Sequence, residues 1–137
     1  MIDYERAKQI ALHASESDEC LNECKAAFDA GLSLLGPEWG RLSAQDVFGI
    51  FRLRAASAKR AGIDVHGIDQ MLERVSKRES DETILIFPFV NTSRLYTIFV
   101  SESDESFIGC ISVPRRFPDP DVDWSTGAAV RREAKKI

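Results

Sequence analysis

The spacing of apolar residues changes from helical to extended at Thr83, and this change restricts the fold more than any other feature of the sequence. Three runs rich in β-branched and aromatic residues follow it, and they predict strands at 83–90, 95–100 and 107–113. The polar connections between the runs are too short for a crossover, so neighbouring strands must be antiparallel. This part of the chain therefore predicts a three-stranded antiparallel meander.

The first predicted strand has an unusual composition, because apolar residues occupy both of its faces. Leu85 and Phe87 alternate with Ile84 and Ile86. Pro88 lies within the same run and has no N–H to donate to a sheet ladder. This combination favours an edge position for the strand, or a bulge at Pro88.

Before Thr83, apolar residues recur at helical spacing in four segments. The signals at the ends of these segments predict helices at about 3–14, 15–35, 43–61 and 64–77. Ser15 and Ser43 each open a capping box, Asp64 can cap the last helix, and Gly62 can end the third. These helices are the only segments available to cover the apolar sheet.

The pattern as a whole predicts an α+β fold, with about four N-terminal helices packed on a C-terminal three-stranded antiparallel meander. We expect one domain over 1–137, with a helical part at 1–78 and the sheet at 83–113. An irregular tail at 114–137 completes it, and this tail could contain a short helix. A chain of 137 residues can bury a sufficient core without disulfides or a metal.

Composition restricts where the protein works and what it binds. The 22 acidic and 18 basic side chains give a net charge of −4, which argues against nucleic-acid binding and weakly for a basic partner. No apolar run is long enough for a membrane helix, and residues 1–6 do not resemble a signal peptide. The three cysteines show no disulfide spacing and are read as thiols. We therefore expect a cytoplasmic protein that does not associate with membranes.

The motifs of common enzymes are missing from the sequence. It has no phosphate-binding loop and no dinucleotide fingerprint, and the segment 31–36 lacks the spacing of a nucleophile elbow. The two histidines, His13 and His66, have no carboxylate or nucleophile placed beside them by local spacing. We expect a protein that is not an enzyme and needs no cofactor, although an active site assembled from distant residues stays open.

Two groups of residues resemble metal ligands. His13, Cys20 and Cys24 would share one face of a continuous helix and offer the ligand types that zinc prefers, but the cap signal near Ser15 breaks that helix. The alternating acids Asp119, Asp121 and Asp123 resemble the start of a calcium loop. That loop would need a Gly at Trp124 and a Glu at Val130. We expect no metal at either group.

Arg54 is predicted on the apolar face of the third helix. Its stem can pack on apolar surface while its head reaches water or a carboxylate. Alternatively, its guanidinium can form the base of a ligand-binding pocket for a carboxylate or phosphate, which would make the protein a ligand-binding or enzymatic domain.

Acidic residues gather in the predicted turn between the second and third strands and again in the tail. Together with one aromatic side chain they form the predicted partner-binding surface, namely Glu102, Asp104, Glu105, Asp119, Asp121, Asp123 and Trp124. Carboxylates would speed association with a basic partner, and the tryptophan would supply buried area. The same acids could instead serve only to keep the protein soluble.

The leading hypothesis is a small acidic protein-binding module that works as a monomer or homodimer. By analogy with bacterial and phage proteins of this size, it would be an immunity protein, antitoxin or inhibitor that neutralises a basic toxin or nuclease by surface complementarity. A structural subunit that dimerises through the strand containing Pro88, or through the remaining apolar surface of the second predicted helix, is a third possibility.

Overall fold

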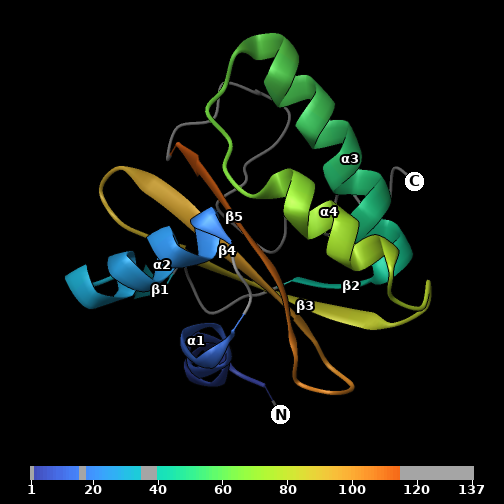
Figure 1. The fold of residues 1–137 in the computed structure, drawn as a ribbon, viewed down its shortest axis with the longest axis horizontal. Coiled ribbons are helices and arrows are strands. Elements are labelled where there is room, and N and C mark those ends of the chain that lie inside the picture. The colour runs from blue at the N-terminus through green and yellow to red at the C-terminus, as the bar shows by residue number, and fades with distance from the viewer. Residues whose placement is uncertain (1, 16–17, 35–39, 115–137) are drawn as a thin grey trace.

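The computed structural model describes residues 2–15, 18–34 and 40–114, which form one antiparallel sheet and four helices (Figure 1). The elements follow the order α1 (Tyr4–His13), α2 (Glu19–Ala30), β1 (Ser33–Leu34), β2 (Gly40–Ser43), α3 (Ala44–Ala61), α4 (Ile68–Ser76), β3 (Thr83–Val90), β4 (Arg94–Ser101) and β5 (Phe107–Pro114). The predicted α+β class is confirmed. The predicted C-terminal tail lies outside the described residues, apart from its first residue.

The sheet contains the predicted meander and two additional strands. β3, β4 and β5 pair as antiparallel neighbours, and β1 and β2 both pair with β3 along its other side. β1 has two residues and β2 has four, so neither contains an apolar run long enough to predict a strand. Both fall within the part of the chain that was predicted to be helical.

Pro88 lies inside the sheet, so the predicted edge position of its strand is wrong. β3 has β4 on one side, while β2 pairs with Thr83–Ile86 and β1 with Phe89–Val90 on the other. Among the described residues, Pro88 has no partner on the second side, because it falls between the ends of the two short strands. Proline has no N–H to donate, and here it occupies the position where the pairing of β3 changes from β2 to β1.

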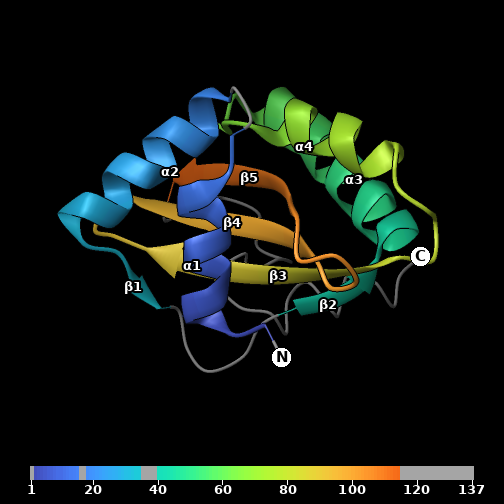
Figure 2. The same cartoon turned by 60° about the horizontal axis from the view of Figure 1, so that its bottom comes forward.

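Helices cover both faces of the sheet, which explains why β3 is apolar on both sides. Ile84, Ile86 and Phe99 pack with α3 and α4. Leu85, Phe87 and Ile98 pack with α1 and α2. The two helix pairs stand apart in Figure 2, with α1 and α2 at one side of the view and α3 and α4 at the other. The four helices therefore do not form a single cover over one face.

The helix ends show which cap signals the chain uses. Ser43 caps α3 by accepting a hydrogen bond from the Asp46 N–H at 3.1 Å, and Gly62 ends α3 in the left-handed conformation, both as predicted. α1 also agrees closely with its prediction. α2 is shorter than predicted, since Asp18 caps it and it ends at Ala30, and the chain continues into β1.

The cap predicted at Asp64 is wrong. α4 begins only after Gly67, and no side chain caps it. The residues before it lie at the edge of the sheet, where His66 bridges to Ser112 and the Asp64 carboxylate accepts hydrogen bonds from His66 and Arg94. This segment positions the site described below.

Gly67 allows that segment to pass close to α2 and β5. Its φ of 80° favours glycine, and a Cβ atom built there would lie 2.6 Å from the Cβ of Cys20 and would clash with the carbonyl oxygen of Cys110. Gly62 has a similar φ of 69° but has open space around it. A side chain at Gly62 would therefore cause backbone strain alone, whereas a side chain at Gly67 would cause both backbone strain and a steric clash.

Substituting the two glycines should cost different amounts of stability. Gly62→Ala should lower the free energy of unfolding by about 1 kcal/mol through left-handed strain alone. Gly67→Ala should lower it by about 2 kcal/mol more, because the packed backbone must also move. Urea unfolding of both variants measures the difference, and equal losses would contradict the close approach at Gly67.

Candidate functional site

The segment before α4 covers part of the outer edge of β5. The His66 N–H donates to the Ser112 carbonyl at 2.8 Å, and the Ser112 N–H donates to the His66 carbonyl at 3.0 Å. This two-residue bridge satisfies backbone groups that an edge strand would leave open. It also brings the His66 side chain up to helix α2.

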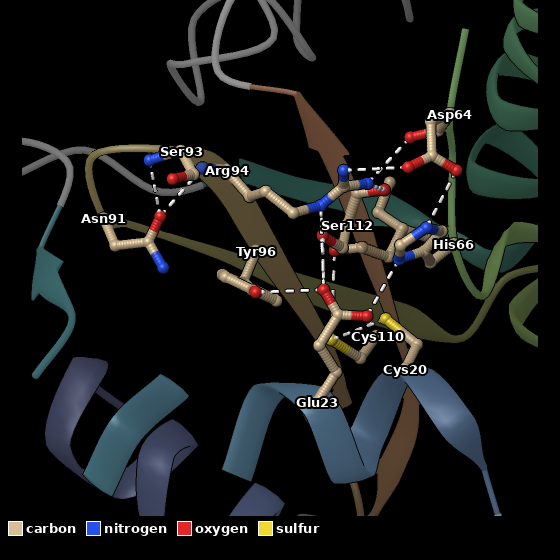
Figure 3. Close-up of polar contacts among 11 residues, drawn as sticks. Cys20, Glu23, Asp64, His66, Asn91, Ser93, Arg94, Tyr96, Cys110 and Ser112 are labelled. Carbon is tan, nitrogen blue, oxygen red and sulfur yellow. Dashed lines mark hydrogen bonds and ion pairs between the residues drawn. The ribbon is translucent and has the colours of Figure 1, made fainter. Parts of the chain in front are cut away.

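The His66 ring lies between two carboxylates (Figure 3). Its Nδ1 is 2.8 Å from Glu23 Oε2, and its Nε2 is 2.9 Å from Asp64 Oδ1. Only a ring that carries protons on both nitrogens donates to both carboxylates. The hydrogen bond from His66 lowers the pKa of Asp64, and the nearby charges of His66 and Arg94 add to this effect.

Glu23 is held in place from the sheet as well. The Tyr96 hydroxyl donates to Glu23 Oε1 at 3.0 Å, and the Ser112 hydroxyl donates to the same oxygen at 3.4 Å. Burial raises the pKa of Tyr96 to about 12, and the negative charge of Glu23 adds to the rise. The phenol therefore stays protonated and keeps donating at neutral pH.

Arg94 joins the same network from β4. Its guanidinium donates to the Ser112 hydroxyl at 2.6 Å and to the Asp64 carbonyl at 2.7 Å. It also pairs with the Asp64 carboxylate at 3.2 Å. Hydrogen bonds among four parts of the chain, namely α2, the segment before α4, β4 and β5, thus fix the orientation of the side chains in this network.

A cavity of about 530 Å³ opens beside this network. Its lining consists of Glu19, Cys20, Glu23, Val65, His66, Gly67, Ile68, Asp69 and Gln70. We call it the acidic cavity, because three of these residues are carboxylic acids and none is Lys or Arg. Glu19 and Asp69 are exposed at the helix starts of α2 and α4. Such a lining favours a positively charged group.

The predicted acidic turn lies between β4 and β5, and each of its carboxylates forms an ion pair within the chain. Glu102 pairs with Arg41, Asp104 with Arg78 and Glu105 with Arg6, each at 2.8 Å. These arginines come from β2, from the segment just after α4, and from α1. The turn therefore connects distant parts of the chain, and its binding of a partner stays a prediction.

Asp104 also organises the turn itself. Its Oδ1 accepts hydrogen bonds from the backbone N–H and the hydroxyl of Ser106. These bonds, followed by the ion pair with Arg78, lower the pKa of the carboxyl. Asp104 is thus a structural residue of the turn.

Asp119, Asp121, Asp123 and Trp124 lie outside the described residues.

Arg54 is half-buried on α3. It lines neither the acidic cavity nor two smaller cavities of about 460 and 260 Å³ in the described part of the chain, the first beside Arg6 and His13 and the second beside Phe48 and Val75.

The helix break that separates His13 from the two cysteines is confirmed, because α1 ends at His13 and α2 begins at Glu19. His13 uses its Nδ1 in a 2.8 Å hydrogen bond with the Gln9 carbonyl of its own helix. Within residues 2–15, 18–34 and 40–114, no group of three or more His, Cys, Asp or Glu side chains is arranged to hold a metal ion.

Sequence reasoning missed Glu23, His66 and the acids at the helix starts. One local signal was present: Asp64 and His66 are two residues apart, which places them on the same side of an extended segment. That signal was hidden because the segment was read as the start of a helix. The pairing with Glu23 joins residues 43 positions apart and had no local signal.

No protein-family model matches this chain, and neither a curated protein nor a solved structure matches it. Among the described residues, no helix combines the length and the apolar character needed to cross a membrane. The function must therefore be argued from the site itself.

Replacing Asp104 should destabilise the fold. An exposed carboxylate without hydrogen-bond partners would have no such effect. Asp104→Asn should lower the free energy of unfolding at pH 7 by about 1 kcal/mol, because it removes a charged acceptor of hydrogen bonds. The folded-state pKa lies below the ordinary value of 3.8, so this stabilisation is present above pH 3.8 and disappears as the pH falls further. Urea unfolding across this pH range measures it.

Asp81→Asn is the matched control, since it removes the same charge from an exposed residue two positions before the start of β3. Its stability at pH 7 should remain near that of the wild type. An Asp104→Asn variant as stable as this control would contradict the structural role of the turn.

Proposed function

We propose that this chain is a protein-binding module whose acidic cavity receives a basic side chain of a partner protein. One observation carries the proposal: Glu19, Glu23 and Asp69 surround a cavity of about 530 Å³ that no Lys or Arg lines. An arginine guanidinium matches such a lining well, because it donates several hydrogen bonds in fixed directions to carboxylates.

The charges around the cavity favour this ligand in two ways. Arg94 compensates part of the charge of Glu23, with which it is paired at 3.6 Å. Glu19 and Asp69 remain exposed at the rim and supply the net negative charge. Since Tyr96 and His66 already orient Glu23, a partner would lose little free energy in ordering the site.

A rigid scaffold suits this mode of recognition. Helices cover both sheet faces, and three ion pairs tie down the turn between β4 and β5. In this proposal the protein is an inhibitor or immunity protein that occupies a basic surface of a toxin or nuclease. The net charge of −4 accelerates the encounter at low salt, and the acidic cavity provides specificity.

The alternative of an anion pocket at Arg54 has less support. Arg54 lines none of the three cavities described above, and the largest of them carries acids, which repel an anion. The geometry therefore favours a cationic ligand.

Neutralising the rim of the acidic cavity should weaken binding of a cationic probe. The probe is an oligo-arginine peptide, titrated into the isotope-labelled full chain and followed by amide chemical shifts. We expect the shifts to map to residues lining the cavity. In the double variant Glu19→Gln/Asp69→Asn, the dissociation constant should rise about fivefold, since two exposed ion pairs contribute about 0.5 kcal/mol each.

The control is the double variant Glu79→Gln/Asp81→Asn, which removes the same two charges from exposed positions between α4 and β3. Its dissociation constant should change less than twofold. If both double variants weaken binding equally, or if the shifts map away from the cavity, net charge alone attracts the peptide and the proposed site is wrong.

A further inference from the structure

Two cysteine sulfurs lie in contact beside the acidic cavity, and one of them belongs to a residue that lines it. The Cys20 and Cys110 Sγ atoms are 3.4 Å apart, although the residues are 90 positions apart in the chain (Figure 3). Cys20 lies in the first turn of α2 and Cys110 in β5. A disulfide needs the sulfurs at about 2.05 Å, so they must approach each other by only about 1.4 Å.

The two thiols differ in their access to solvent. Cys20 is only 1% exposed, but it is one of the residues lining the acidic cavity. Cys110 is completely buried behind it and lines none of the three cavities. A small oxidant that enters the cavity therefore reaches Cys20 first.

The environment of Cys110 keeps it protonated until a reaction occurs. Contacts with the Cys20 and Cys24 thiols, together with complete burial, raise the pKa of Cys110 well above its usual value. Such a thiol is a poor first nucleophile, because the thiolate is the reactive form. Its position in contact with Cys20 instead suits it to react in a second step.

We propose that Cys20 and Cys110 form a redox pair, which a hydroperoxide converts to an intramolecular disulfide. The Cys20 thiolate attacks one peroxide oxygen, the O–O bond breaks, and the leaving oxygen takes a proton to form water or an alcohol. The sulfur of Cys110 then loses its proton and attacks the resulting sulfenic acid, which releases water. Two thiols are oxidised by two electrons, and one peroxide is reduced.

The third cysteine serves as an internal comparison. Cys24 lies on α2 one turn after Cys20 and is also buried, but it does not line the acidic cavity. In this proposal it keeps its thiol. The disulfide would join α2 to β5 directly beneath the cavity, but its formation does not depend on whether the cavity binds a protein.

The test is to treat the folded full chain with hydrogen peroxide, block the remaining thiols, and map the linkages by peptide mass spectrometry. We expect two of the three cysteines to lose their thiols, with a single linkage between Cys20 and Cys110. Dithiothreitol should restore all three thiols. The Cys24→Ala variant should form the same linkage, whereas Cys20→Ala should keep both of its thiols.

The linkage found in the oxidised wild-type chain is the decisive result, so the test does not depend on whether each variant folds. A linkage that includes Cys24 would overturn it. Oxidation of Cys20 to sulfinic acid without a linkage would also overturn it, as would three intact thiols under conditions that oxidise free cysteine.

Discussion

Burial of the sheet on both faces is the constraint on which the rest of the structure depends. β3 and β4 have no polar face, so water must be excluded from both sides, and this removes a large apolar area from solvent. One helix pair cannot cover two faces. The chain therefore places α1 and α2 on one side and α3 and α4 on the other.

The candidate site lies at the edge of the sheet, where α2 of one helix pair comes near the start of α4 of the other. The segment between α3 and α4 passes along the edge of β5, where Gly67 allows it to approach α2 and the two cysteines. His66 then meets Glu23, and the starts of α2 and α4 come together around the acidic cavity. Acids in the first turn of a helix interact favourably with the helix dipole, so Glu19 stabilises α2 and Asp69 stabilises α4.

The sequence predicted those elements whose signals are local. β3, β4, β5 and the ends of α3 were predicted closely, because β-branched runs and caps at Ser43 and Gly62 act within a few residues. Predictions failed where a longer contact competed with a local preference. Asp64 pairs with His66 and Arg94 where a helix cap was expected, and the carboxylates of the turn between β4 and β5 pair with arginines up to 99 positions away.

By itself, the sequence determined an α+β protein with an antiparallel meander, a mild negative charge and three thiols. The spacing of hydrophobic residues, the capping residues and the composition can be read directly from the sequence, without coordinates. Only the tertiary structure decided which acids pair internally, which surround a cavity, and which thiols come into contact. The physical reason is that those contacts arise when two helix pairs cover opposite faces of one sheet, and no segment of the chain encodes that arrangement alone.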